Sequence, residues 1–179
     1  CLRSLADWVG ELIVVDSGST DRTLELARKF TDKIYKHPFE NYSKQRNWAQ
    51  ENLPISHPWI FQVDADERVT SGLKSALIHL FNDQDQLNQA AGIMVRRRIV
   101  FMGRWIKHGG IYPTYHLRIY KKDLGRCEDR DYDQHFFVEG DTLQLDADLI
   151  EDTATTLHSW TARHNRWAQK EARFLADET

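Results

Sequence analysis

The chain has 179 residues, of which 41% are hydrophobic and 28% charged, and its formal net charge is −3. This balance is typical of a globular protein of about one domain, and it gives no reason to expect a nucleic acid as a partner. The two cysteines, Cys1 and Cys127, exclude a disulfide framework and match no zinc-binding spacing, so we expect a reducing, cytoplasmic environment.

The first strand is predicted at residues 11–15, where the run ELIVV is apolar, rich in β-branched side chains and ends at Asp16. Residues 1–10 look like the end of a helix that leads into this strand. The sequence therefore begins inside an architecture, and we expect an N-terminal segment to be missing from it.

The loop SGSTDRT follows this strand and predicts the start of a helix. Gly18 permits a tight turn, Ser19 or Thr20 is expected to cap the helix, and Asp21 suits the positive charge of the first turn. The alternation continues with a strand, a helix and a further strand, predicted at 33–37, 43–53 and 59–64.

A helix is predicted after the stretch FQVDADERV, with Thr70 or Ser71 as its cap, because the apolar residues that follow recur at helical spacing. The polar segment 82–89 is predicted as a loop. The rest of the chain is richer in strands, predicted at 92–102, 117–122, 136–140 and 143–150.

The chain closes with a helix predicted at 161–177, whose tryptophans and basic residues leave two interpretations open. Such a helix can rest on anionic lipid, or it can dock on the core of its own protein. Acidic residues such as Glu171 weaken the first interpretation. The chain lacks a run of about 18 uncharged apolar residues and a start typical of a signal peptide, so we expect neither a span nor a leader within it.

Alternating strands and helices in the first half predict an α/β fold, with a mostly parallel sheet flanked by helices. Ligands of such sheets bind beyond the carboxyl ends of the strands. Asp16 and Asp64 both follow strands, so we expect them to meet in one crevice.

Asp64, Asp66 and Glu67 place three carboxylates almost side by side in this crevice. Carboxylates packed so closely raise each other's pKa values unless a cation or hydrogen-bond donors compensate. Hard oxygen ligands suit Mg²⁺ or Mn²⁺, and a neighbouring carboxylate can accept hydrogen bonds from both hydroxyls of a ribose. We therefore expect Asp64 to hold a ribose and Asp66 to bind the metal of a nucleotide diphosphate. A solvated acidic turn is the alternative for this motif taken alone.

The stretches LIVVDSGSTDRTLELA, SKQRNWA and IFQVDADERV resemble, in order and spacing, the nucleotide-sugar half of the family 2 glycosyltransferases, which have the GT-A fold and an Asp-x-Asp motif. GRWIKHGGIYPTYHLRIY is similar to the next segment of the bacterial subgroup that builds lipopolysaccharide core and other surface polysaccharides. The likeness covers most of the chain. It implies one glycosyltransferase domain over 1–179, with a nucleotide-sugar half at 1–91 and a strand-rich acceptor half at 92–179.

By this resemblance, Asp16 contacts the uridine of a UDP-sugar, Arg46 lies near the base or the phosphates, Asp64 holds the ribose and Asp66 binds Mn²⁺ or Mg²⁺. The same site is expected to include Ser17, Asp21 and Ala65. Family members usually open with a strand that ends in a Tyr-Asn-Glu type segment and helps to hold the base, and that segment is absent here.

The resemblance further implies transfer of the sugar with inversion to a saccharide or lipid-linked acceptor, in surface polysaccharide assembly at the inner membrane face. The closing helix would supply a peripheral membrane contact. The reaction needs a carboxylate that deprotonates the acceptor hydroxyl. The subgroup usually carries a His-Glu pair where this chain has Asp133-Gln134, so Asp133 is our first candidate for the base. The alternatives are His135, Asp131 and Asp129, and His135 could equally be a core histidine.

The segment after the central strands supplies a candidate acceptor side. Trp105 and His108 flank Gly109 and Gly110, and an aromatic platform beside flexible glycines suits a sugar ring, although core packing explains the tryptophan equally well. The arginine triplet 96–98 is expected to meet phosphates or to face solvent.

Two further functions remain as alternatives. Haloacid-dehalogenase-like phosphatases also place Asp-x-Asp after a strand, but they typically continue with a small pair such as Gly-Thr, where this chain has Glu67-Arg68. A non-catalytic nucleotide-sugar-binding module could keep Asp16 and Asp64 and lack a working base. Of these functions, the sequence favours a metal-dependent glycosyltransferase.

Overall fold

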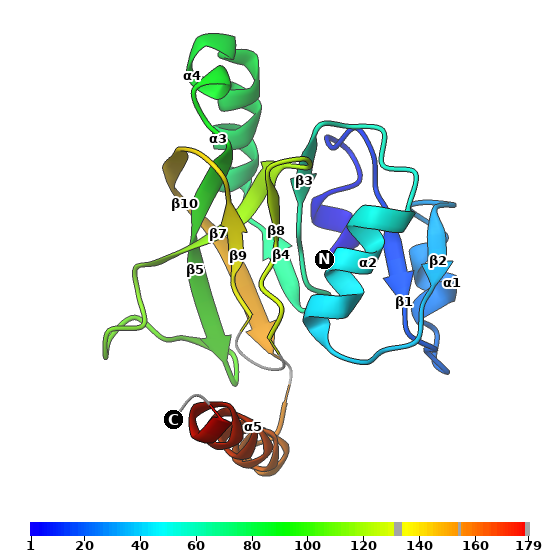
Figure 1. Cartoon of the computed structure of the whole chain (residues 1–179), viewed down its shortest axis with the longest axis vertical. Helices are drawn as coiled ribbons and strands as arrows, with labels where there is room; N and C mark the ends of the chain where they lie inside the picture. Colours follow the sequence, from blue (N-terminus) through cyan, green and yellow to red (C-terminus); the bar gives the residue numbers. More distant parts are fainter. Residues whose placement is uncertain (131–133, 154, 178–179) are drawn as a thin grey trace.

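Figure 1 shows a computed structural model of the protein. The structure describes residues 1–130, 134–153 and 155–177. A 3-10 helix at Leu2–Ser4 precedes the first strand. The helices are α1 (Thr23–Ala27), α2 (Tyr42–Asn52), α3 (Ser71–Asn82), α4 (Gln84–Asn88) and α5 (Leu157–Asp177). The strands are β1 (Val14–Asp16), β2 (Ile34–Lys36), β3 (Trp59–Phe61), β4 (Glu67–Val69), β5 (Gly92–Phe101), β6 (Arg104–Trp105), β7 (Thr114–Lys121), β8 (Gly125–Cys127), β9 (Phe136–Val138) and β10 (Thr142–Thr153).

The strands form one large sheet and two small ones. The large sheet has the order β3-β7-β5-β10-β4, and β6 pairs with β5 beside this path. Strands β1 and β2 pair in parallel as a separate two-stranded sheet, and β8 and β9 pair antiparallel. The fold therefore divides the early strands between two sheets.

The prediction of a mostly parallel sheet is wrong, because the large sheet is mixed. Within it, only β5 and β10 pair in parallel, while β3–β7, β5–β7, β5–β6 and β4–β10 are antiparallel. The alternation that suggests parallel strands is confined to the first half, and only β3 and β4 of that half join the large sheet. In the second half, β5, β6 and β7 follow one another through loops, and such neighbours pair antiparallel.

The core lies where α3 packs on the large sheet. Thr70 caps α3, since its side chain accepts a hydrogen bond from the Leu73 N–H at 3.1 Å, as one of the two predicted caps would do. The buried face of α3 presents Leu73, Leu77 and Leu80, and the sheet supplies apolar side chains that include Ile93, Val95, Ile119 and Leu149. This core packs α3 against β5, β7 and β10 of the large sheet.

Helix α2 is joined to the second half of the chain by polar contacts rather than by an apolar face. Ser43, Asn47 and Gln50 recur at helical spacing and so share one side of the helix. The Ser43 hydroxyl donates to the Glu128 carbonyl at 2.6 Å, and the Gln50 amide donates to the Lys122 and Gly125 carbonyls at 2.6 and 2.7 Å. Asn47 makes two hydrogen bonds to the main chain of Cys127, both at 3.0 Å.

An apolar cavity of about 480 Å³ lies between β1 and β3. The cavity is lined by Ile13, which precedes β1, and by Val15 of β1, Trp59 and Phe61 of β3, and Leu77 of α3. Within residues 1–130, 134–153 and 155–177, β1 pairs only with β2 and β3 pairs only with β7. Each strand therefore keeps one edge without a strand partner among these residues, and residues of both strands line the cavity.

Several local predictions differ from the structure. The segment 82–89, predicted as a loop, contains α4, whose N-cap Asp83 accepts from the Gln86 N–H at 3.1 Å. Neither Ser19 nor Thr20 caps α1, which begins after Arg22. The sequence does not predict β4, β6 and β8, because these strands of two or three residues are too short to show an alternating pattern and lie in no longer apolar run.

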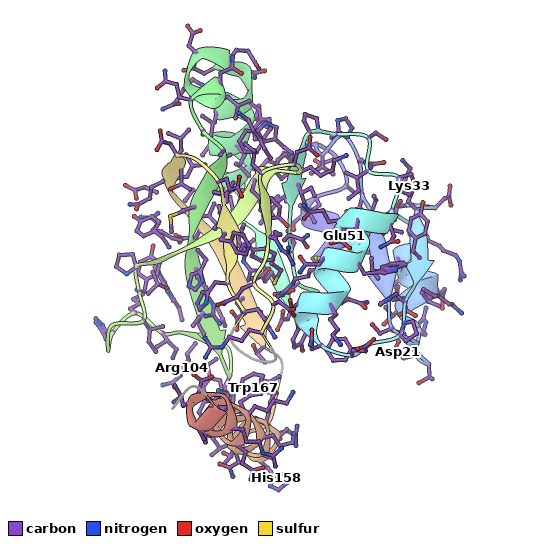
Figure 2. All side chains as sticks on the ribbon, in the orientation of Figure 1. Asp21, Lys33, Glu51, Arg104, His158 and Trp167 are labelled. Carbon is purple, nitrogen blue, oxygen red and sulfur yellow. The ribbon has the colours of Figure 1, made fainter. Side chains whose placement is uncertain are left out.

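Helix α5 docks on the body through its aromatic side. Trp160 packs against Phe101 of β5 with ring centroids 5.4 Å apart, and Glu171 pairs with Arg130 at 2.6 Å. Figure 2 shows Trp167 on the side of α5 that faces the sheet and His158 on the opposite side. These contacts favour the docking interpretation. No helix among the described residues is long and apolar enough to cross a membrane.

Candidate functional site

Asp16 ends β1 and is buried, with 5% of its surface exposed. Its carboxylate accepts hydrogen bonds from the N–H of Gly18 at 2.9 Å and of Ser19 at 3.1 Å. Gly18 has a φ of 99°, a conformation that a side chain disfavours. Hydrogen bonding by Ser19 and by the Gly18 N–H outweighs burial and lowers the pKa of the Asp16 carboxyl. This carboxylate is thus ionised and shapes the loop that follows it.

The other predicted residues of this loop make local contacts. The Ser17 hydroxyl accepts from the Gln45 side chain of α2 at 2.9 Å. The exposed Asp21 carboxylate accepts from the Thr23 N–H at 2.9 Å and so supports the first turn of α1. Their roles toward a ligand remain predictions.

The acidic stretch after β3 is a closed turn. The Glu67 N–H donates to the Asp64 carbonyl at 2.9 Å, and the Glu67 carboxylate accepts from the Asp64 N–H at 2.7 Å. Glu67 itself is buried, with 1% of its surface exposed, whereas Ala65 and Asp66 are exposed at the tip. Glu67 therefore stabilises the turn from inside the protein, whereas Asp66 lies exposed at its tip.

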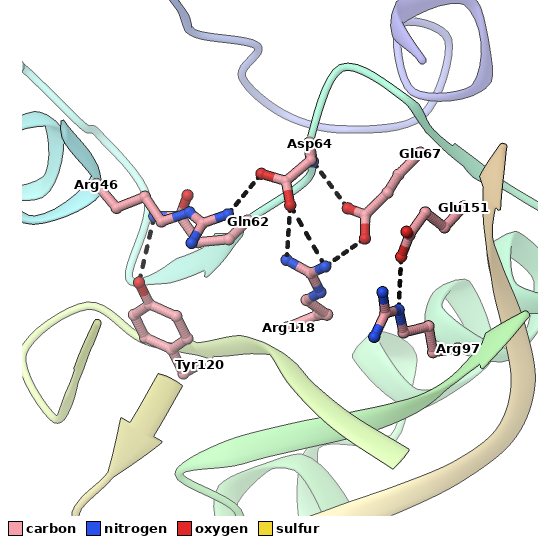
Figure 3. A network of polar contacts seen from close by, with 8 residues as sticks. All are labelled: Arg46, Gln62, Asp64, Glu67, Arg97, Arg118, Tyr120 and Glu151. Atoms are coloured by element: carbon pink, nitrogen blue, oxygen red, sulfur yellow. Dashed lines mark hydrogen bonds and ion pairs between the residues drawn. The ribbon is translucent and has the colours of Figure 1, made fainter. Parts of the chain in front are cut away.

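Two arginines hold the third acid, Asp64, from different elements (Figure 3). Arg46 of α2 donates to one oxygen of the Asp64 carboxylate at 2.7 Å. Arg118 of β7 approaches the other oxygen at 3.4 and 3.5 Å and also forms an ion pair with Glu67. The two guanidinium groups lie 5.2 and 6.0 Å from the ring of Phe136. Arg46, which we expected near the base or the phosphates of a donor, thus contacts Asp64, and Arg118 is a partner of Asp64 that the sequence did not predict.

The electrostatics separate the three acids further. Burial raises the pKa of Asp64, but Arg46 and Arg118 outweigh it and the net pKa is lowered. Burial raises the pKa of Glu67 to about 7 despite Arg118. Burial, together with the charges of Glu151 and Asp64, raises the pKa of Asp66. Although its carboxyl group is partly buried, Asp66 as a whole residue is exposed, and a cation bound there would relieve this repulsion.

Asp66 fits the chemistry of a hard cation, since it offers exposed carboxylate oxygens beside other negative charge. In the described part of the chain, no group of three or more His, Cys, Asp or Glu side chains is arranged to hold a metal ion. A divalent ion at Asp66 would therefore take other ligands from water and from a bound phosphate, as Mg²⁺ commonly does.

The predicted general base falls partly outside the described residues. Asp133, our first candidate, and Asp131 both lie there. Asp129 is exposed, and so is His135, whose Nδ1 lies 3.6 Å from the Glu128 carboxylate. The interpretation of His135 as a core histidine is wrong, because the ring is not buried.

The predicted acceptor side forms its own cluster. The ring of Trp105 has Arg98 at 4.0 Å and Lys107 at 4.4 Å from its centroid, and Tyr112 meets it edge-on at 5.1 Å. His108, Gly109 and Gly110 are exposed, and both glycines have positive φ. In Figure 1 the loop between β6 and β7 projects on the side of the large sheet away from α2 and β1, so the structure does not gather these residues around Asp64.

The side chains of the arginine triplet are only partly exposed, and each contacts another residue of the protein. Arg96 pairs with Asp148 at 2.9 Å, Arg97 pairs with Glu151 at 2.5 Å, and Arg98 covers Trp105. The partners lie on β10, which runs beside β5. The sequence did not predict these partners, because strand neighbours cannot be read from one strand alone.

Comparison with known proteins gives a family for this chain. The family model described as glycosyl transferase family 2 matches residues 1–140. The lipopolysaccharide core biosynthesis glycosyltransferase LpsC of Rhizobium meliloti (strain 1021) is 31% identical over 72% of this chain and 47% of its own length. An uncharacterized glycosyltransferase of Rickettsia bellii (strain RML369-C) is 28% identical over 68% of this chain and 40% of its own. The chain thus spans less than half the length of these relatives.

Among solved structures, residues 1–349 of S. aureus TarS are similar at 20% identity and a TM-score of 0.46. The match covers 68% of this chain and 43% of that one.

Proposed function

The chain belongs to glycosyl transferase family 2, and from this premise we propose that it transfers a glycosyl group from a UDP-sugar to a saccharide or lipid-linked acceptor, with inversion at the sugar. The product would belong to a cell-surface polysaccharide, because LpsC, one of the relatives, is a lipopolysaccharide core glycosyltransferase. The family leaves the phosphatase alternative without support.

One observation carries the proposal for the donor site. Asp64 is held ionised by Arg46 and Arg118, and the exposed Asp66 stands two residues further on the same turn. An ionised, oriented carboxylate can accept hydrogen bonds from both hydroxyls of a ribose. Asp66 would then bind Mn²⁺ or Mg²⁺, which supplies charge neutralisation for the departing diphosphate. Asp16, at the end of β1, would contact the uridine.

The chain's own groups would perform the remaining steps. A general base, with Asp133 as first candidate and His135, Asp131 and Asp129 as alternatives, would take the proton of the acceptor hydroxyl as that oxygen attacks the anomeric carbon. The bond from that carbon to the diphosphate breaks as the new bond forms, so the configuration inverts. Trp105, His108, Gly109 and Gly110 stay proposed as acceptor contacts, as does a peripheral membrane contact of α5.

Titration calorimetry with UDP tests the donor site. We expect UDP to bind in the presence of Mn²⁺, and the affinity to fall strongly in EDTA and in the Asp66→Asn variant. Asp66 is exposed, so this substitution should leave the fold intact. Asp85→Asn, an exposed aspartate on α4, is the matched control and should bind as the unchanged protein does. Failure of the unchanged protein to bind UDP would remove the basis of the proposal.

A further inference from the structure

A buried ion pair lies directly behind the proposed ribose contact. The Glu67 carboxylate is 1% exposed and the Arg118 side chain 12% exposed, and the two are in contact. Glu67 also accepts from the Asp64 N–H at 2.7 Å, while Arg118 reaches the Asp64 carboxylate at 3.4 Å. One carboxylate therefore fixes both the main chain of Asp64 and the guanidinium that touches its side chain.

Stability alone gives little reason for this pair. The cost of removing two charges from water is comparable to their attraction, so a buried ion pair is often no better than apolar residues of the same volume. The pair has a second consequence that apolar residues could not reproduce. Arg118 reaches two acids at once, and its planar guanidinium fixes the angle between them.

The geometry also shows which residue can reach a ligand. Arg118 is almost covered, with Phe136 near its guanidinium, whereas the Asp64 side chain is 38% exposed. Both carboxylate oxygens of Asp64 are already held, one by Arg46 and one by Arg118. A ligand that approaches this carboxylate therefore meets a side chain whose orientation is set before binding.

We propose that Arg118, anchored by Glu67, is a positioning residue of the donor site that orients the Asp64 carboxylate for the ribose hydroxyls of the nucleotide. The inference rests on the proposed function, because it takes Asp64 as the ribose contact. Arg118 acts through Asp64 and does not touch the nucleotide. Its loss leaves the Asp64 carboxylate held by Arg46 alone, so the carboxylate can turn about that single contact and the hydrogen bonds to the ribose weaken while the rest of the nucleotide site is unchanged.

Two nucleotides that differ only in the ribose hydroxyls test this role. The dissociation constants of UDP and of 2′,3′-dideoxy-UDP are measured with Mn²⁺ for the unchanged protein and for Arg118→Met. We expect the substitution to weaken UDP about tenfold, as the loss of one charged hydrogen bond would. The affinity for the dideoxy compound should change by less than about twofold, because it lacks the groups that Asp64 holds.

Further variants keep the test independent of folding. Glu67→Gln keeps an acceptor for the Asp64 N–H but loses the charge that anchors Arg118, and we expect the same selective loss for UDP, at a smaller size. Arg118→Lys keeps the charge without the planar group and should recover only part of the affinity. Arg96→Met is the matched control, since Arg96 is also an inter-strand ion-pair partner, and it should change neither affinity.

The outcomes separate this inference from the proposed function. If Arg118→Met lowers the affinity for both nucleotides equally, the positioning role is overturned. Arg118 would then contact the phosphates directly, or its loss would disturb the structure in general. Equal binding of the two nucleotides to the unchanged protein removes the ribose contact of Asp64, and with it this inference. Absence of UDP binding to the unchanged protein contradicts the proposed function itself.

Discussion

Replacing Asn47 with alanine tests how α2 is attached to the rest of the protein. The Asn47 amide donates to the Cys127 carbonyl and its oxygen accepts from the Cys127 N–H, both at 3.0 Å. Cys127 is 0% exposed, so the substitution leaves a buried main-chain donor and a buried acceptor without these partners.

The expected cost follows from those two groups. A buried polar group that loses its partner costs about 1–3 kcal/mol, and water entering the vacated space recovers part of it. We expect Asn47→Ala to lower the free energy of unfolding by about 2–4 kcal/mol. For a chain of this size, the melting temperature should fall by roughly 5–15 °C.

Urea unfolding followed by circular dichroism measures this change, with the midpoint compared at constant slope. Asn52→Ala is the matched control on the same helix. Its amide donates to the Trp48 carbonyl one turn earlier and is exposed, so we expect a change below about 0.5 kcal/mol. A loss for Asn47→Ala as small as that of the control would refute the view that these polar contacts hold α2 in place.

Two other predictions concern β7 and β8. Burial, and then the charges of Arg97 and Arg118, lower the pKa of His116 to about 4, so its NMR titration should show a neutral ring down to about that pH. The pKa of His116 in the unfolded state is about 6.5, so the neutral buried ring makes its full contribution to stability above that pH, and this contribution is lost as the pH falls toward 4. If the stability of His116→Gln does not show this loss over the same pH range, the lowered pKa of His116 is supported. Gly125→Ala should destabilise by about 1–3 kcal/mol in thermal unfolding, since a Cβ there would lie 2.5 Å from the buried Tyr120 ring; an unchanged melting temperature would contradict this.

The sequence predicts the exposed parts of the site better than its supports. An aspartate that ends an apolar strand is visible in one sequence, and Asp16 does end β1, whereas Asp64 lies three residues beyond β3, which ends at Phe61 rather than at residue 64. The role of Glu67 is not visible, because its burial depends on the pairing of β4 with β10, far along the chain. Arg118 carried no such signal, because a charged residue between Leu117 and Ile119 alternates to the other side of the strand and is typical of a position that faces solvent.

Sheet direction was the main error, and its cause is physical. Local periodicity identifies strands one at a time, but pairing is decided by the connections and by which faces can be buried together. Of the strands in residues 1–91, β1 and β2 leave the large sheet altogether. The helices were easier to predict, because their caps and apolar spacing are local.

The cavity between β1 and β3 has a consequence for binding energetics. Asp16 belongs to the small parallel sheet, whereas Asp64 leads out of the large one, and no strand pairing in the described residues joins these sheets. A ligand that contacts both acids would therefore connect the small parallel sheet to the large sheet. Binding of such a ligand would slow amide hydrogen exchange in β1 and β2. The reason is that a ligand which binds only the closed form suppresses local opening, and exchange slows most in the segments whose local stability is lowest.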